Sequence, residues 1–198
     1  MALGRAGVIL AAGASERMGR PKALLAWGDT TLLEYALREA RAAGVEDLVV
    51  VLGPATRHLQ LGTPTAFNPD PDAGRSASIR IGSQALPDGV GTILIQSVDQ
   101  PVSGDVIDAL FRAVEGGAEL VVPTYRGRRG HPACFSGRLL GELRGVSETG
   151  EGLRAVVRRH AAQLVEVAVN SQAVLWNLND PDAYAAAVAT LFSPELLP

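Results

Sequence analysis

The sequence has one cysteine, Cys134, among its 198 residues. A single cysteine excludes an intrachain disulfide and a cysteine cluster for zinc or an iron–sulfur centre. No apolar run approaches the roughly 18 residues that a membrane-spanning helix requires. The short apolar stretch near the N-terminus is followed at once by basic residues, which is not typical of a signal peptide. We therefore expect a protein of the reducing cytoplasm that has no membrane partner.

A strong excess of charge is also missing. Lysine and arginine number 18 and aspartate and glutamate 21, so the formal net charge is −3. This balance provides neither a basic footprint for nucleic acid nor a charged disordered tail. Hydrophobic residues make up 47% of the chain, and its length suits one well-buried domain rather than two of ordinary size. We expect residues 1–198 to form a single domain that binds no nucleic acid.

Two common phosphate-binding motifs are absent. The P-loop pattern G-x-x-x-x-G-K-[ST] does not occur, because Lys22 follows Pro21 and precedes Ala23. The dinucleotide pattern G-x-G-x-x-G does not occur either, since five residues separate Gly13 from Gly19. The second absence disfavours a nicotinamide-dependent reductase on a Rossmann sheet.

Apolar runs typical of buried strands alternate with helical patterns along the whole chain, which indicates an α/β domain with a largely parallel sheet. Residues 68–74 contain two prolines and a glycine and are expected to be irregular. The expected strands are 7–12, 47–53, 64–67, 92–96, 119–123, 131–135 and 163–169. The expected helices are 31–44, 56–61, 75–86, 106–114, 139–143, 152–160 and one that Asp180 and Pro181 open.

The stretch Val8–Lys22 changes character halfway along. An apolar strand opens into a segment with two glycines, one serine, three basic side chains and a proline. Glycine lets backbone N–H groups approach an anion closely, and arginine or lysine neutralises its charge. This pattern suits a polyphosphate, although a solvated turn after an edge strand would have the same composition.

Three polar segments follow predicted strands and are expected to meet, because ligands collect at the carboxyl ends of parallel strands. They are the Gly13 loop, Asn68–Asp70 and Asp99. Asp99 comes directly after an apolar strand that Pro101 closes. A carboxylate suits Mg²⁺, which takes its remaining ligands from water and substrate phosphates. Asp99 could also simply cap the following turn.

Two further segments allow both a functional and a structural interpretation. Ser76 and Ser78 stand at a helix start, where hydroxyl groups cap the helix or bind a base edge. The segment Arg129–Pro132 carries a histidine that could simply pack on its strand. The nearby arginines Arg126, Arg128 and Arg129 suit an anionic acceptor, and a solvated hairpin would contain the same residues.

The motif Leu10-Ala11-Ala12-Gly13-x-Ser15-x-Arg17-Met18-Gly19-x-Pro21-Lys22 resembles the N-terminal motif of the MobA-like NTP transferase family. Val98-Asp99-Gln100-Pro101 and Asn68-Pro69-Asp70 also match that family. Arg129-Gly130-His131-Pro132 most closely matches its molybdenum cofactor cytidylyltransferase branch. The resemblance runs from Val8 to about Tyr184. It implies a three-layer, mostly parallel, Rossmann-like α/β nucleotidyltransferase fold.

The resemblance also implies a set of site residues. Arg17, Lys22 and Asp99 would be catalytic, Asp99 and Asn177 would hold Mg²⁺, and the segment Arg129, Gly130, His131 and Pro132 would bind the acceptor. The implied nucleotide-binding residues are Leu10, Ala11, Ala12, Gly13, Ala14, Ser15, Arg17, Lys22, Asn68, Ser78 and Asp99.

One segment departs from the family pattern. The last strand of such enzymes usually ends in Asp-Ile-Asp-Thr-Pro, with the first aspartate as the second metal ligand. Here the chain reads Asn177-Leu178-Asn179-Asp180-Pro181. An amide oxygen can coordinate Mg²⁺ but brings no charge, so we expect altered metal affinity.

The implied reaction transfers CMP from CTP to molybdopterin, or to its molybdenum-bearing form, and releases pyrophosphate. The expected partners are CTP or another NTP, a molybdopterin-type acceptor, and a molybdoenzyme or its chaperone. One alternative is a related nucleotidyltransferase that uses GTP or another phosphorylated acceptor. The other is a nucleotide-binding accessory protein without turnover, which Asn177 favours.

Overall fold

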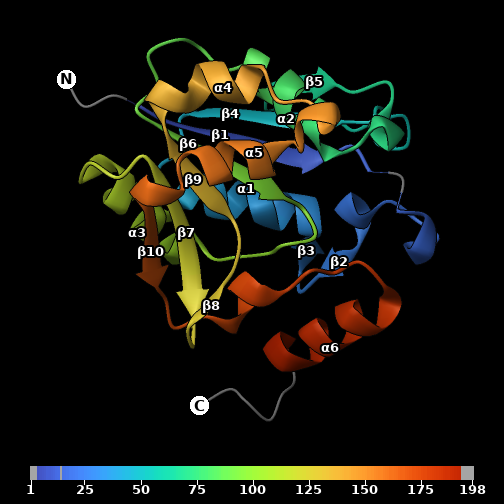
Figure 1. Cartoon of the computed structure of the whole chain (residues 1–198). Helices are drawn as coiled ribbons and strands as arrows, with labels where there is room; N and C mark the ends of the chain where they lie inside the picture. The colour runs from blue at the N-terminus through green and yellow to red at the C-terminus, as the bar shows by residue number, and fades with distance from the viewer. Residues whose placement is uncertain (1–3, 14, 193–198) are drawn as a thin grey trace.

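The computed structural model describes residues 4–13 and 15–192 and has three layers (Figure 1). A central sheet has the strand order β10-β7-β9-β6-β1-β4-β5, and β8 pairs with β7 at one side. The α/β fold class and the three-layer arrangement expected from the sequence are therefore confirmed. The strands are β1 (Arg5–Ala11), β4 (Asp47–Leu52), β5 (Thr65–Phe67), β6 (Thr92–Ser97), β7 (Leu120–Tyr125), β8 (Arg128–Arg129), β9 (Ala133–Ser136) and β10 (Leu164–Ala168).

Most neighbouring strands run parallel. The β1–β4, β1–β6, β4–β5 and β7–β10 pairs are parallel, whereas β9 runs antiparallel to both β6 and β7. Because β1 lies between β4 and β6, the carboxyl ends of these three strands meet at one edge of the sheet. That edge carries the Gly13 loop and Asp99.

Helices cover both faces of the sheet and form two hydrophobic cores. Alternate residues of β1 point to opposite faces: Ile9 packs against α1 and α3, and Val8 packs against the side of α2, α4 and α5. The helices are α1 (Leu32–Ala42), α2 (Arg75–Gln84), α3 (Gly104–Glu115), α4 (Leu140–Arg144), α5 (Leu153–Arg159) and α6 (Pro181–Phe192). No helix in the part of the chain that the structure describes is long and apolar enough to cross a membrane.

The local predictions made from the sequence are confirmed at the start of α1 and wrong at residues 56–61. The capping box at the start of α1 is present: the Glu34 N–H donates to Thr31, and Glu34 accepts from the Thr31 N–H. Residues 56–61 do not form the expected helix. The Thr56 hydroxyl binds the backbone of neighbouring segments instead, and the chain makes only single turns there.

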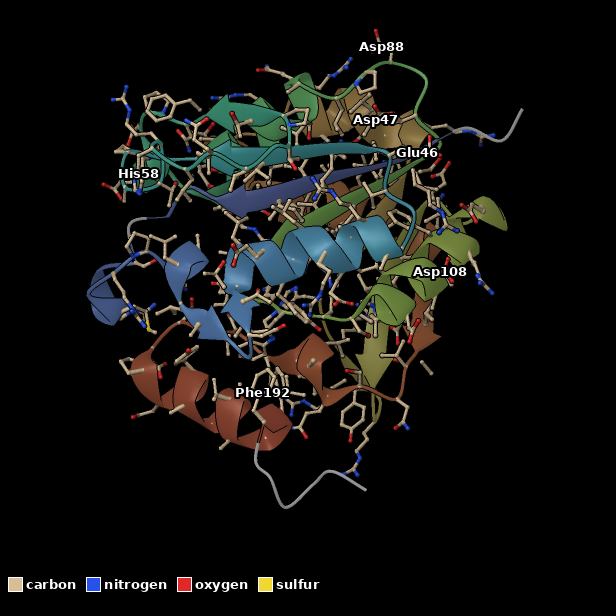
Figure 2. The ribbon with its side chains drawn as sticks, turned by 180° about the vertical axis from the view of Figure 1, so that it is seen from behind. Glu46, Asp47, His58, Asp88, Asp108 and Phe192 are labelled. Atoms are coloured by element: carbon tan, nitrogen blue, oxygen red, sulfur yellow. The ribbon has the colours of Figure 1, made fainter. Side chains whose placement is uncertain are left out.

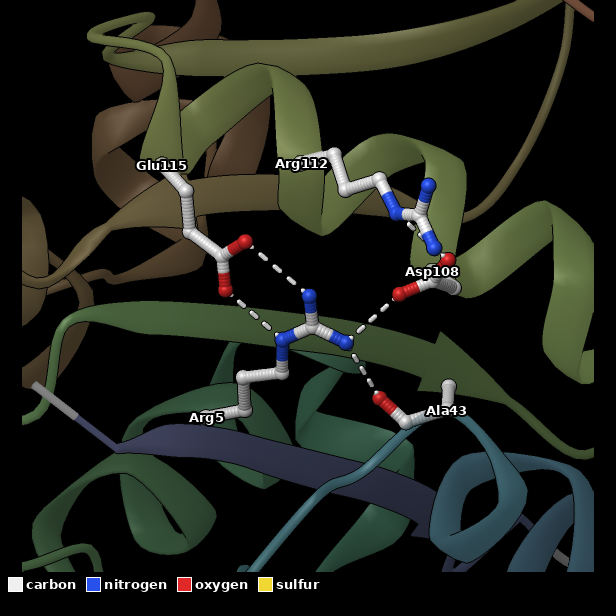
Figure 3. Close-up of polar contacts among 5 residues, drawn as sticks. All are labelled: Arg5, Ala43, Asp108, Arg112 and Glu115. Atoms are coloured by element: carbon white, nitrogen blue, oxygen red, sulfur yellow. Dashed lines mark hydrogen bonds and ion pairs between the residues drawn. The ribbon is translucent and has the colours of Figure 1, made fainter. Parts of the chain in front are cut away.

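Arg5 ties together three elements at the amino end of β1 (Figure 3). Its guanidinium binds Glu115 through Nε at 2.7 Å, and Nη1 donates to Asp108 and to the Ala43 carbonyl, each at 2.7 Å. The guanidinium also lies over the Phe111 ring, 5.0 Å from its centroid. This network fixes α1 and α3 against the sheet at the edge opposite the Gly13 loop.

Helix α6 packs on the small hairpin of β2 (Ala26–Trp27) and β3 (Thr30–Thr31). Trp27 is 1% exposed and forms the centre of this contact. Phe192, at the far end of α6 (Figure 2), meets the Trp27 ring edge-on with centroids 5.5 Å apart. Asp180 caps the helix by accepting from the Ala183 N–H at 2.9 Å. These contacts anchor the segment Asn177–Asp180, which returns to the carboxyl edge of the sheet.

Candidate functional site

A pocket of about 210 Å³ lies at the carboxyl edge of the sheet. The Gly13 loop, the start of α2 and the end of β6 form its walls, so segments that follow three different strands do converge. Its lining residues are Leu10, Ala11, Ala12, Gly13, Ser15, Lys22, Ala23, Pro71, Gly74, Arg75, Ser78, Ser97, Val98 and Asp99.

Internal hydrogen bonds shape the Gly13 loop. The Ser15 backbone adopts a left-handed φ of 60°, and its carbonyl accepts from the Met18 N–H at 2.8 Å. The Ser15 hydroxyl accepts from the Lys22 N–H at 3.1 Å. Ser15 therefore closes the loop and brings Lys22 back to the pocket.

A second turn supports this loop from below. The buried Thr56 hydroxyl donates to the Ala11 carbonyl at 3.1 Å and accepts from the Gly53 N–H at 3.0 Å. The backbones approach so closely that a Cβ atom on Gly53 would lie 2.2 Å from the Ala12 oxygen. The pocket wall at Ala11 and Ala12 is thus held by backbone packing, with little freedom to shift.

The central charged group of the pocket is an ion pair between Lys22 and Asp99. The Lys22 Nζ lies 2.8 Å from Asp99 Oδ2 and 2.5 Å from Asn179 Oδ1. Both charged side chains are largely buried, at 14% and 16% exposure. The other carboxylate oxygen, Asp99 Oδ1, is buried and has no hydrogen-bond partner among the described residues. An orphaned carboxylate oxygen in a pocket is a suitable ligand for a divalent cation.

Backbone and amide hydrogen bonds fix Asp99 from three sides. The Val98 N–H donates to the Leu10 carbonyl at 3.2 Å, and the Leu178 N–H donates to the Asp99 carbonyl at 3.0 Å. Within β6, the fully buried Gln96 donates through Nε2 to the Gln100 carbonyl at 3.1 Å. Gln96 thereby closes the turn that carries Asp99.

Ser78 lines the pocket, and Asn68, which does not line it, holds the Ser78 hydroxyl. The buried Asn68 Nδ2 donates to Ser78 Oγ at 2.9 Å, and Asn68 Oδ1 accepts from the Asp70 N–H at 3.0 Å. Since Ser78 Oγ accepts from Asn68, its own proton is available to a ligand. Asn68 therefore holds the Ser78 oxygen in place and leaves its proton to a ligand in the pocket.

The Arg129–Pro132 segment lies beside the pocket, and its residues differ in their surroundings. Arg129 points to the surface and pairs with Glu166 at 2.6 Å. His131 is exposed, and surrounding protein atoms lower its pKa; the charge of Arg75 lowers it further, and that of Asp99 opposes both. Pro132 is buried. His131 is thus the member of the segment that interacts electrostatically with pocket residues.

Gly130 is packed against the backbone of the turn before Asn177. Its N–H donates to the Pro123 carbonyl at 2.8 Å, and a Cβ atom would lie only 2.3 Å from the Val174 oxygen. The next N–H, that of His131, donates to the same Val174 carbonyl at 2.8 Å. Only glycine permits this approach without a shift of one of the two segments.

Gly130→Ala is expected to lower the free energy of unfolding by about 1–3 kcal/mol, because the added methyl group overpacks against backbone. Thermal unfolding measures this. Gly141→Ala is a matched control, since a Cβ atom at Gly141 in α4 meets nothing within 4 Å. If Gly130→Ala melted at the wild-type temperature, the close contact with Val174 would be refuted.

Four of the nucleotide-binding, catalytic and metal-binding residues implied by the resemblance do not line the pocket or cannot be placed: Asn68, Arg17, Asn177 and Ala14. Arg17 is exposed and does not line the pocket, and Asn177 is exposed. Ala14 lies outside the described residues. The sequence did not point to three further residues of the site: Asn179, which contacts Lys22, Gln96, which closes the turn of Asp99, and Arg75, which lines the pocket. Their signals were an Asn-x-Asn pair, a glutamine inside an apolar strand, and an arginine at a helix start.

A sequence model of the MobA-like NTP transferase domain matches residues 7–165. Among solved structures, Rv0371c of Mycobacterium tuberculosis superposes with a TM-score of 0.81 at 31% identity, covering 95% of this chain and 98% of that one. A manganese complex of Rv0371c superposes with a TM-score of 0.78 at 30% identity, covering 95% and 99%.

Curated relatives match over shorter stretches. The 2-C-methyl-D-erythritol 4-phosphate cytidylyltransferase of Streptomyces avermitilis is 34% identical over 131 residues, covering 60% of this chain and 52% of that enzyme. The chain thus spans about half the length of that relative. A probable molybdenum cofactor guanylyltransferase of Bacillus cereus is 44% identical over 46 residues, or 23% of this chain and 22% of its own.

A relative with a different activity in its name covers more of the chain. The nicotine blue oxidoreductase of Paenarthrobacter nicotinovorans is 29% identical over 173 residues, covering 77% of this chain and 81% of that protein. The family model nevertheless spans most of the sequence, from within β1 to the start of β10. The chain belongs to the MobA-like NTP transferase family.

Proposed function

We propose that the chain is a nucleotidyltransferase that moves CMP from CTP to a molybdopterin-type acceptor and releases pyrophosphate. The observation that carries the proposal is the Lys22–Asp99 pair, set in a pocket between the Gly13 loop and the end of β6. A basic group and a carboxylate with a free oxygen suit a nucleoside triphosphate that binds with a divalent cation.

In the proposed reaction, an oxygen of the acceptor's terminal phosphate attacks the α-phosphorus of CTP in line. A new P–O bond forms, the bond between the α-phosphorus and the bridging oxygen to the β-phosphate breaks, and pyrophosphate leaves. Little covalent chemistry falls to the protein, so positioning and charge stabilisation dominate. Lys22 would hold the triphosphate and offset the charge that develops on pyrophosphate. Arg17, on the exposed loop, would add a second cation once the nucleotide is bound.

The backbone of Leu10–Ser15 would surround the base and phosphates. The surroundings of Gly13 are open, since a Cβ atom there would meet nothing within 4 Å, so an anion can approach its backbone closely. Ser78, oriented by Asn68, would donate its proton to an acceptor atom of the nucleotide. Both features are consistent with a pyrimidine nucleotide and do not depend on the acceptor.

The residues present fit a divalent cation such as Mg²⁺. Asp99 Oδ1 would be one ligand, because it is buried without a partner. Asn179 Oδ1 and Asp99 Oδ2 both contact the Lys22 ammonium group, so Asn179 would be the second oxygen ligand once Lys22 turns to the triphosphate, in place of the exposed Asn177. When bound, the cation would neutralise charge on the α-phosphate and the leaving group. The manganese complex of Rv0371c is consistent with this use of the fold.

The choice of CTP and of molybdopterin rests on separate arguments. Arg129-Gly130-His131-Pro132 resembles the cytidylyltransferase branch, and the Streptomyces relative is named a cytidylyltransferase. The guanylyltransferase relative supports GTP as the alternative nucleotide. A third candidate, a nicotine blue-type oxidoreductase, is favoured only by the long match to that relative. The Lys22–Asp99 pair has no evident role in hydride transfer.

A panel of nucleoside triphosphates with Mg²⁺ in a thermal-shift experiment tests the nucleotide. We expect CTP to raise the melting temperature most, because a ligand stabilises the state that binds it. If GTP raised the melting temperature most, GTP would be the nucleotide substrate instead of CTP. Stabilisation by NADH or NADPH with none by any triphosphate would contradict nucleotidyl transfer. CTP binding without pyrophosphate release in the presence of acceptor would indicate an accessory protein.

A further inference from the structure

Three charged side chains line the pocket, and two of them are paired with each other. Lys22 and Asp99 bind each other at 2.8 Å. The third, Arg75, is exposed and makes no ion pair or side-chain hydrogen bond with the side chains that the structure describes, which are those of residues 4–13, 15 and 17–192 apart from residue 150. A guanidinium in a pocket without a partner of its own is available to an anionic ligand.

The start of α2 holds Arg75 at the pocket opening. Arg75 is the first residue of α2 and lies one helical turn before Ser78, so both line the same wall. The carboxylate of Glu148 accepts a hydrogen bond from the Ser76 N–H at 2.7 Å. That contact stabilises the helix start and lowers the pKa of Glu148. Arg75 is therefore presented on a fixed backbone.

The register of the sheet brings the acceptor segment to the same wall. Ile95 of β6 pairs with Ala133 of the antiparallel strand β9. Ser97, which lines the pocket, comes two residues after Ile95, and His131 comes two residues before Ala133. Because the strands are antiparallel, both residues lie toward the same end of this strand pair. Surrounding protein atoms lower the pKa of the exposed Arg75 and the charge of Asp99 opposes this shift, while the charge of Arg75 lowers the pKa of His131. Arg75 thus interacts with Asp99 on the nucleotide side and with His131 on the acceptor side.

We propose that Arg75 binds the attacking phosphate of the acceptor, and that this chain therefore requires an acceptor with a terminal phosphate or an equivalent dianion. This inference rests on the proposed nucleotidyl transfer. A guanidinium pairs two oxygens of one phosphate through its planar fork and leaves the third free. The free oxygen forms the bond to the α-phosphorus as pyrophosphate departs, and Arg75 offsets the repulsion between the two phosphates.

The first experiment uses inorganic phosphate as a probe of the acceptor phosphate. Titration calorimetry follows phosphate binding to the protein saturated with CTP and Mg²⁺, so that the triphosphate site is filled. We expect Arg75→Ala to weaken phosphate binding roughly 10- to 100-fold, because a hydrogen-bonded charged partner is lost. The affinity of Arg75→Lys for phosphate should fall between those of the wild type and Arg75→Ala. Arg80→Ala, on the same helix but outside the pocket lining, should leave phosphate binding unchanged.

The second experiment separates the two substrates by kinetics. Arg75→Ala is expected to raise the KM for the acceptor and to leave the KM and Kd for CTP close to wild type. A rise in the Kd for CTP with phosphate binding intact would overturn the proposal, since Arg75 would then belong to the triphosphate site. Absence of phosphate binding to the wild-type CTP complex would also overturn it. Failure of the wild-type protein to bind CTP would instead refute the proposed function itself.

Discussion

Lys22→Ala is expected to reduce pyrophosphate release by a factor of roughly 100 to 1,000, the usual effect of removing one group that stabilises transition-state charge. Lys22 reaches the pocket because Ser15 closes the loop on its backbone N–H. Among the described residues that line the pocket, Lys22 is the only lysine. Alanine leaves the pyrophosphate charge without this partner.

The same substitution affects stability as well as turnover. Without Lys22, the Asp99 carboxylate stays largely buried and loses its cation, which is unfavourable unless Mg²⁺ replaces it. The variant should therefore melt below wild type, and Mg²⁺ should recover part of the difference. Arg20→Ala is the matched control, because this cation of the same loop is exposed and does not line the pocket. Near-wild-type turnover of a folded Lys22→Ala protein would refute the role of Lys22.

Asp99→Asn should lower turnover by a similar factor of roughly 100 to 1,000. Asparagine keeps the size of the side chain and an oxygen for Lys22, but it removes the negative charge that strengthens the binding of a divalent cation. We therefore expect a folded protein whose Mg²⁺ dependence moves to much higher concentrations. Activity is measured as pyrophosphate release over a Mg²⁺ titration.

The control for this substitution is Asp105→Asn. Asp105 is an exposed aspartate in the first turn of α3, away from the pocket. The Asp105→Asn variant should keep both the wild-type turnover and the wild-type Mg²⁺ dependence. If Asp99→Asn had the same Mg²⁺ dependence as Asp105→Asn, Asp99 could not be a ligand of the cation.

The predictable parts of the fold are those that local sequence determines. The capping box at Thr31, the apolar strand before Gly13 and the cap at Asp180 depend on neighbours within a few residues. The order of the strands in the sheet, in contrast, does not depend on neighbours within a few residues. An apolar run carries no direction, so the antiparallel insertion of β9 between β6 and β7 could not be read from the residues themselves.

In the site too, some features follow from local sequence and others depend on how distant segments pack. The Gly13 loop and Asp99 were predictable because each follows an apolar strand, and the topology then brings them together. The contact of Lys22 with Asn179 joins residues 157 positions apart, and it depends on the packing of α6 on Trp27 and on the bond from the Leu178 N–H to the Asp99 carbonyl. The expected helix at 56–61 failed for a related reason, since the Thr56 hydroxyl is engaged by Gly53 and Ala11.

Mass analysis of the product tests the central proposal most directly. The wild-type protein is incubated with molybdopterin cofactor, Mg²⁺ and each of the four nucleoside triphosphates in turn. The proposed function predicts one new species, the cytosine dinucleotide of the cofactor, formed with an equal amount of pyrophosphate and lost in Lys22→Ala and Asp99→Asn. Unchanged cofactor with every triphosphate, from a protein that binds CTP and Mg²⁺, would contradict it.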